Sequence, residues 1–254
     1  MKNNNGQILL ITVMLLATVM TIVLSVSFKS VTETQVTKLE EENQKALAAA
    51  ESAIEAALKQ NSTATIGSGS LISISGFEGT ATIESLTAPT FTTPNIAKDG
   101  SHTFYLGDYN IDAKTIGASV AQDITICFET GSTKPAIEVT LVKTSGIKKY
   151  PVDPDGRITN AASGSSCSPD STNYSYSVNV PGADIGLDGK FLLVRVLYAP
   201  TKLLFSRTID LDLPVQGRTI SSNVTSSTSI GVSKKIVLFQ SYPQIPGEFF
   251  TTAF

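Results

Sequence analysis

Residues 8–28 have the sequence ILLITVMLLATVMTIVLSVSF, which contains no charged side chain. As a helix, a run of about 21 residues spans about 31 Å at 1.5 Å per residue, which matches the hydrocarbon core of a bilayer. The Thr and Ser side chains inside the run can donate hydrogen bonds to carbonyl groups of the preceding turn, so lipid can accommodate them. The run therefore predicts a membrane-spanning helix.

The charges beside this run give little information about the orientation of the helix in the membrane. Lys2 precedes it and Lys29 follows it, so positive charge is spread over both ends. The shortness of the leader favours a cytoplasmic N-terminus. Ser25-Val26-Ser27 offers the small-x-small pattern of a secretory cleavage site, but the apolar run is longer than the roughly 7–15 residues of a signal peptide.

The helical signal continues well beyond the apolar run. Residues 31–58 contain neither Gly nor Pro. Apolar side chains recur there at three- and four-residue spacing and trace one stripe, formed by Leu39, Leu47, Ala50, Ile54 and Leu58. We therefore expect one continuous helix of about 50 residues, with a transmembrane first half and an amphipathic second half.

A different pattern follows the helix. Residues 61–70 are rich in Ser, Thr and Gly, and strand-like segments then recur between turn signals. The predicted strands are 71–75, 80–86, 103–106, 123–129, 137–143, 174–180, 191–198, 203–211, 219–226 and 235–240. The fold expected is α+β, with the long N-terminal α-helix packed on a face of an antiparallel β-rich C-terminal domain of one or two sheets.

Charge and cysteine content narrow the classes of function. The net charge is −3, and neither the first 59 residues nor the remainder has the basic excess that phosphate neutralisation needs, so no nucleic-acid partner is expected. Cys127 and Cys167 are too few for a disulfide framework. They could form one bridge outside the cytoplasm or remain two unpaired thiols.

Several motifs have both a chemical and a plain structural interpretation. Asp153-Pro154-Asp155-Gly156 and residues 184–189 have metal-loop residues without EF-hand spacing, so a turn is favoured for both. We expect His102, the only histidine, to be a surface residue at a strand end rather than a ligand. The pairs Lys148-Lys149 and Lys234-Lys235 are expected to be solvated. With no GxSxG, HExxH, P-loop or CxxC motif, the sequence predicts no enzyme, metal or cofactor.

The C-terminal residues 239–254, FQSYPQIPGEFFTTAF, combine five aromatic residues with Pro243 and Pro246. Because proline interrupts strand pairing, we expect this tail to lie extended across a surface. Its aromatic side chains either cap the core of the domain or form an exposed patch that docks a partner subunit.

The start of the chain resembles a known class of signal. A short polar leader ends in Gly6 and is followed by Gln7 and the apolar helix, which resembles a type IV prepilin. Residues 44–58, QKALAAAESAIEAAL, resemble the corresponding stretch of minor pilins of the PilX kind. The resemblance covers residues 1–58 and implies that a prepilin peptidase cuts after Gly6 and methylates the amine of Gln7. Glycine suits that position because a peptide without a side chain can enter a membrane-embedded protease closely.

One position departs from the pattern of major pilins. Major pilins carry Glu at the fifth mature position, where its charge pairs with the terminal amine of a neighbouring subunit. Counted from Gln7, that position is Ile11. A buried carboxylate is retained only where it has a partner, and a subunit without it cannot make this bond. The departure favours a minor pilin or a tip pseudopilin over a bulk filament subunit.

The resemblance implies a structural subunit of a type IV pilus or a type II secretion-like filament. The expected organisation is a leader at 1–6, a transmembrane and amphipathic helix at 7–59, a linker at 60–70 and a β-rich extracellular domain at 71–254. Its expected partners are other pilin subunits, through the helix, the prepilin peptidase and the cytoplasmic membrane. Two alternatives remain: an uncleaved, signal-anchored adhesin or ligand-binding β domain, and a membrane-tethered enzyme.

Overall fold

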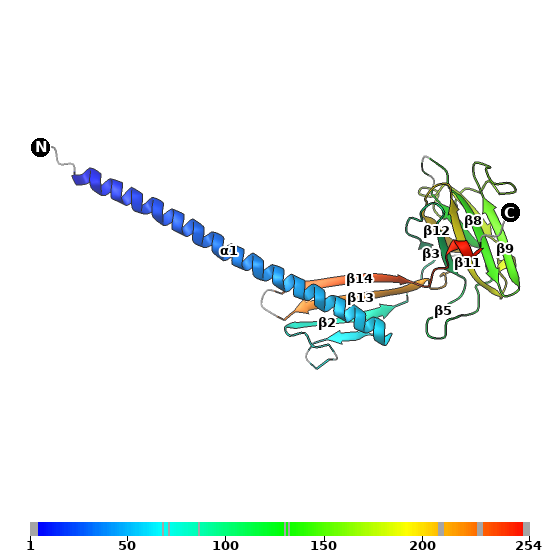
Figure 1. The fold of residues 1–254 in the computed structure, drawn as a ribbon, viewed down its shortest axis with the longest axis horizontal. Helices are drawn as coiled ribbons and strands as arrows, with labels where there is room; N and C mark the ends of the chain where they lie inside the picture. The colour runs from blue at the N-terminus through cyan, green and yellow to red at the C-terminus, as the bar shows by residue number, and fades with distance from the viewer. Residues whose placement is uncertain are drawn as a thin grey trace. The chain divides into compact units, whose positions relative to one another are not determined.

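The structure is a computed structural model. It describes residues 9–67, 69–70, 72–85, 87–129, 131, 133–207, 211–227 and 231–248, together with the helical backbone of residues 5–8 and 249–250. One long N-terminal helix packs on an antiparallel sheet, and further antiparallel sheets follow (Figure 1), so the predicted α+β fold class is confirmed. The chain forms two compact units, Met1–Ile83 with Ile220–Leu238 and Glu84–Thr219 with Phe239–Phe254.

The elements have the following bounds. The helices are α1 (Asn5–Gln60), α2 (Gly182–Ile185) and the 3-10 turn η1 (Gly247–Phe250). The strands are β1 (Ala64–Ile66), β2 (Phe77–Glu84), β3 (Thr90–Thr92), β4 (Ser101–Tyr105), β5 (Tyr109–Asn110), β6 (Thr115–Ile116), β7 (Ile124–Phe128), β8 (Ala136–Lys143), β9 (Gly146–Val152), β10 (Tyr176–Val180), β11 (Gly189–Leu197), β12 (Leu203–Arg207), β13 (Gly217–Ser226) and β14 (Ser233–Ser241).

Helix α1 runs for 56 residues without interruption, so the prediction of one continuous rod is confirmed. It ends at Asn61, whose φ of 50° is left-handed. The Asn61 amide donates to the carbonyl of Leu58 and the Ser62 amide to that of Ala57, which satisfies the last carbonyl groups of the helix.

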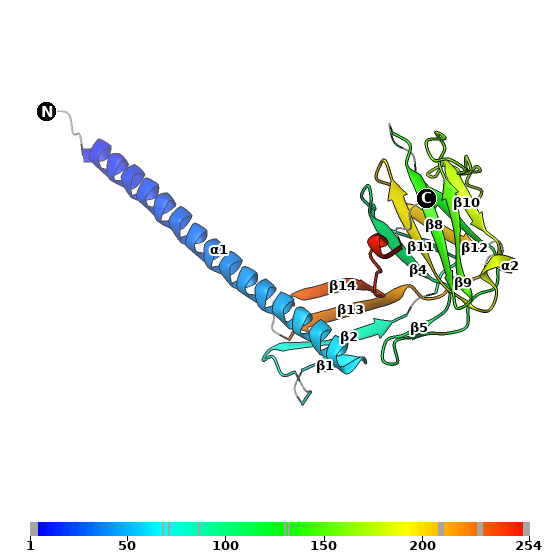
Figure 2. The ribbon, with the colours of Figure 1, turned by 45° about the vertical axis from the view of Figure 1, so that its right-hand side comes forward.

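In the first unit, the C-terminal part of α1 lies on a four-stranded sheet with strand order β1-β2-β13-β14 (Figures 1 and 2). The helix contributes a face made almost entirely of alanine: Ala46, Ala49, Ala50, Ala53, Ile54 and Ala57. The sheet contributes Phe77, Ala81, Ile220 and Val224, among others. Small side chains let the helix backbone lie close to the sheet, so this interface is shallow and tightly packed.

The predicted apolar stripe is therefore only half right. Ala50 and Ile54 face the sheet and Leu58 packs against the same cluster, but Leu47 is 42% exposed and Leu39 is 41% exposed. Leu39 and Leu47 lie outside the buried contact, which alanine residues form. Alanine has a low hydropathy, so a search for apolar spacing gives it little weight. The sheet also begins earlier than predicted, since β1 falls inside the stretch interpreted as a linker and residues 72–75 form only an isolated bridge at Ile72.

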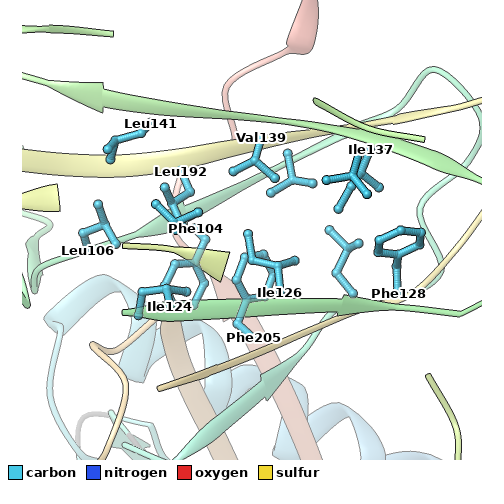
Figure 3. Packing of buried hydrophobic residues seen from close by; sticks show 14 of the residues in the cluster. Phe104, Leu106, Ile124, Ile126, Phe128, Ile137, Val139, Leu141, Leu192 and Phe205 are labelled. Carbon is cyan, nitrogen blue, oxygen red and sulfur yellow. The ribbon is translucent and has the colours of Figure 1, made fainter. Parts of the chain in front are cut away.

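The second unit contains two antiparallel four-stranded sheets, one ordered β10-β7-β12-β3 and the other β4-β11-β8-β9. Their facing side chains form one apolar core (Figure 3), in which Phe104 of β4 stacks on Phe205 of β12 with ring centroids 4.3 Å apart. The apolar residues of β7 and β11, which lie between turn signals, had indicated these strands. Strands β3, β5, β6 and β9 were not predicted, because they are very short or, in β9, interrupted by Lys148, Lys149 and Pro151.

We expect a leucine at Ala53 to destabilise the first unit. Ala53 has no exposed surface, so Ala53→Leu would force the helix off the sheet at a cost of about 1–3 kcal/mol. Thermal unfolding of the full chain in detergent would measure this as a lower Tm. The matched control is Ala48→Leu, at an exposed position of the same helix, which should leave Tm unchanged. Equal Tm values for the two variants would contradict the alanine interface.

Candidate functional site

The first half of α1 is the strongest candidate for a functional surface. Its large apolar side chains from Leu9 to Phe28 are between 47% and 70% exposed. By length and composition, this N-terminal helix can span a membrane. Water disfavours such a surface by about 1.5–3 kcal/mol for each large apolar side chain left exposed, so burial of this surface in an apolar environment is favoured.

The polar side chains of this half are compatible with lipid. The hydroxyl groups of Thr12, Thr18 and Thr21 donate to the carbonyl oxygens of Leu9, Leu15 and Thr18 at 3.0, 2.8 and 2.8 Å. Each hydroxyl is thereby satisfied within its own helix, which removes the main cost of placing it in hydrocarbon. Charge begins only at Lys29, which pairs with Glu33 one turn later at 3.8 Å.

The two processing residues predicted from the sequence, Gly6 and Gln7, lie outside the residues whose side chains the structure describes. Cleavage after Gly6 and methylation of Gln7 therefore stay predictions. Ile11, at the position where major pilins carry Glu, is described and is 60% exposed on the apolar half of α1.

Cys127 and Cys167 are joined by a disulfide bond, the first of the two states that the sequence left open. Both residues are buried with Tyr174 and Leu204, on the side of β7 that faces away from the main core. The bond attaches the loop before β10 to the sheet, where Ser165 also bridges to Ser177. It therefore acts as a structural staple of the second unit.

The Asp153 motif is a turn, as favoured from the sequence. The Asp153 carboxylate is almost fully buried and accepts hydrogen bonds from the backbone amides of Asp155, Arg157 and Ile158 and from the Arg157 guanidinium. Burial alone would raise the pKa of Asp153, but these hydrogen bonds outweigh it and hold the pKa below its usual value. The carboxylate is thus fully used inside the turn.

The other predicted charge sites also have structural roles. Lys148 pairs with Asp184 at 2.6 Å and keeps 52% of its side chain exposed, so it is solvated as expected. Lys149 pairs with the buried Glu138 at 2.6 Å and is only 22% exposed, so the expectation is wrong for Lys149. Asp188, in the second loop considered for a metal, bonds to the Ser145 hydroxyl at 2.6 Å. Within the described residues no group of three or more His, Cys, Asp or Glu side chains is arranged to hold a metal.

The prediction of a surface position for His102 is wrong. His102 is in β4, only 9% exposed, and stacks on Phe91 with ring centroids 5.7 Å apart. Its Nε2 is buried and has no hydrogen-bond partner among the described residues. Burial lowers the pKa of His102 to about 4, so the ring is neutral at pH 7.

The C-terminal tail lies against the second unit. Tyr242 is buried against Tyr105 and Tyr109, with ring centroids 5.6 and 5.1 Å away, and so caps the domain. Phe239 remains 51% exposed. The side chains of Phe249, Phe250 and Phe254 lie outside the described residues, so the choice between cap and docking patch is answered only for Tyr242.

An open hollow of about 480 Å³ lies beside β9 and β10 of the second unit. It is lined mainly by small and polar side chains, including Asn160, Ser163, Ser165 and Asn179, and its ionisable lining residues are Lys149 and Tyr150. Lys149 is already paired with Glu138. The hollow offers hydrogen-bonding groups without an arrangement for acid–base or nucleophilic chemistry.

Comparison of the sequence with protein-family models and with curated proteins found no match. Among the features of the structure, the sequence had identified the apolar helix and the cysteine pair. It had missed the alanine interface and the burial of His102, because neither leaves a distinctive residue pattern.

We expect removal of the disulfide to destabilise the second unit by about 2–4 kcal/mol, since the bond closes a loop with a sequence separation of 40 residues. Thermal unfolding of a Cys127→Ser, Cys167→Ser variant should show a lower Tm than the oxidised chain. Reductant should lower the Tm of the natural sequence to a similar value and leave that of the variant unchanged. No difference between oxidised and reduced chains would contradict a structural role.

Stability should also depend on pH through His102. A histidine with a folded-state pKa of about 4 binds more protons when unfolded, where its pKa is about 6.5. Its contribution is therefore fully present above pH 6.5, and about 3 kcal/mol is lost as the pH falls from 6.5 towards 4. Denaturation curves at several pH values should show this loss, and His102→Phe, which can pack against Phe91, should remove it. Parallel pH profiles for both chains would refute the prediction.

Proposed function

We propose that this protein is a structural subunit of a type IV pilus-like or type II secretion-like filament, in the class of minor pilins and pseudopilins. It is held in the cytoplasmic membrane by α1, with its β-rich part outside the cytoplasm. It enters a filament after its leader is removed. Its role is structural rather than catalytic.

The observation that supports this proposal most strongly is the division of one unbroken helix into two surfaces. Up to Phe28 the helix exposes only uncharged side chains, whereas from Ala46 to Ala57 one face is buried on the sheet. A continuous helix transmits the position of its membrane half rigidly to that sheet. Apolar rods of this kind can leave lipid by packing against one another, since neighbouring helices provide an equally apolar environment.

The replacement of the usual acidic residue by Ile11 supports a minor or priming role. Without a carboxylate at this depth, the subunit has no charge to pair with the amine of a neighbour. Before it enters a filament, the subunit also has no charged side chain at this depth of the membrane that would need a partner. A subunit of this type is suited to a place in the filament where that bond is not required.

The alternative is a signal-anchored adhesin or ligand-binding domain that never polymerises. The second unit favours it in one respect, since its disulfide-stapled sandwich presents the polar hollow beside β9 and β10. Both functions use the same membrane helix. They differ in whether the leader is removed and whether the helix leaves the membrane.

The mature N-terminus distinguishes these functions. For a pilin, mass spectrometry of the protein from its native membrane should find a chain that starts at methylated Gln7, whereas an intact Met1 would support the anchored alternative. A start near Phe28 would indicate ordinary secretion and refute both.

We expect Gly6→Val to block processing, because the new side chain hinders entry of the scissile peptide into the peptidase. The measurement is the mass of the membrane-bound protein, which should keep its leader. Asn3→Val is the matched control, since it changes the leader away from the cleavage site and should be processed normally. Normal maturation of the Gly6→Val protein would count against the site.

A further inference from the structure

Strand β14 is an uncovered edge of the sheet in the first unit. It has nine residues and is the last strand in the order β1-β2-β13-β14, and no strand or loop among the described residues pairs with its outer side. Val237 is 59% exposed and Leu238 is 42% exposed. An edge of this length presents unpaired N–H and C=O groups that can bind a further strand.

The other edges of the described sheets are blocked in ways that natural proteins commonly use. Strands β1 and β3 have three residues each, which is too short to template a partner. The edge of β10 is paired with a loop through the Ser165–Ser177 bridge, and the Cys127–Cys167 bond holds that loop in place. These edges therefore lack a run of unpaired N–H and C=O groups long enough to bind a further strand.

Two longer edges are blocked by side chains. On β4, the amides of Tyr105 and Thr103 donate to the side-chain oxygens of Gln216 and Gln244 at 2.8 and 2.7 Å, so two glutamines take the place of a neighbouring strand. Strand β9 contains Pro151, which cannot donate to a partner strand, and its end is bridged to a loop at Ala162. Against this background the open edge of β14 is an exception.

The side chains of β14 indicate the chemistry of a partner. Ile236 packs against the helix-facing core, so alternation places Lys234, Ile236 and Leu238 on that face and Lys235 and Val237 on the other. Each face therefore has a lysine near the start of the strand and an apolar side chain after it. A complementary strand would place carboxylates opposite the lysines and apolar side chains opposite Val237 and Leu238.

A second copy of β14 does not meet this requirement. Strand β14 runs in roughly the same direction as α1 (Figures 1 and 2), and copies anchored in one membrane have parallel helices. Two β14 edges could then pair only in parallel, which sets Lys234 and Lys235 beside their own counterparts. Like charges directly opposite each other are destabilising, so the strand that fits belongs to a different protein.

We propose that residues 233–238 of β14 receive an extended strand from a different subunit of the filament, with acidic side chains opposite Lys234 and Lys235 and apolar side chains opposite Val237 and Leu238. This inference rests on the proposed function, since it takes the partner to be a filament component. It adds a specific contact outside the membrane to the packing of the helices. Such a contact would determine which subunit lies beside this one.

Hydrogen exchange tests the proposal directly. In the full chain in detergent, the outward amides of residues 233–238 should exchange rapidly, whereas in purified filaments that contain the protein they should exchange more slowly, by roughly tenfold or more. Mass spectrometry of peptides from this segment measures the difference. If the protein is present in filaments but these amides exchange equally fast in both states, the inference is overturned while the proposed function stands. If the protein is absent from filaments, the proposed function itself fails.

Charge reversal provides a second test. A Lys234→Glu, Lys235→Glu variant should be incorporated into filaments several-fold less than the natural sequence, with an unchanged Tm in detergent. The matched control reverses two exposed lysines of the second unit, Lys98→Glu with Lys114→Glu, and should be incorporated normally. Equal incorporation of the two variants would overturn the role assigned to the lysine pair. If the Lys234→Glu, Lys235→Glu variant has a lower Tm, Val237→Asp tests the same edge without altering the lysines and should also be incorporated less.

Discussion

The contact between the alanine face of α1 and the sheet of the first unit is the constraint on which the rest of this structure depends. That sheet is assembled from two distant parts of the chain, β1 and β2 before the second unit and β13 and β14 after it. One helix face, from Ala46 to Ala57, covers both parts. Because the buried side chains are mostly methyl groups, the contact gains its stability from close approach of backbones rather than from the volume of any single residue, and even one larger side chain would disturb it. Among the described residues, the exposed apolar half of the helix is connected to the sheet through this face.

The second unit is stabilised by different means. Its two sheets share a large apolar core, and its loops are fastened by the Cys127–Cys167 bond and by the Asp153 turn. The ion pairs of Lys148 and Lys149 join β9 to α2 and to β8. The chain enters this unit after Ile83, leaves it after Thr219 and returns to it at Phe239, so the segment Glu84–Thr219 is inserted between β2 and β13 of the first sheet. An insertion with its own core can change its loops and hollows without altering the helix–sheet contact, and that is where ligand specificity most readily varies.

Much of the fold could be predicted from the sequence. The uncharged run before Lys29 and the absence of Gly and Pro from residue 8 to residue 60 can be read directly from the sequence, so the continuous helix was predictable. Strands such as β7 and β11 were found because they alternate or are continuously apolar. The buried face of α1 was predicted partly in the wrong place because alanine contributes little to hydropathy. The more apolar Leu47 was assigned to this face, although it is 42% exposed. The short strands, the paired state of Lys148 and Lys149 and the burial of His102 depend on partners far away in the chain, which periodicity cannot reveal.

The exposed apolar surfaces are distributed unevenly between the two units. In the second unit they are mostly isolated side chains, such as Ile147 and Leu187, and scattered single residues are ordinary on any protein surface. In the first unit they are continuous, over the uncharged half of α1 and along β14 at Val237 and Leu238. The other long edges of the described sheets are blocked by glutamine side chains and by proline, whereas these two apolar surfaces are left open. Among the described residues, the exposed apolar surface is therefore concentrated in the first unit.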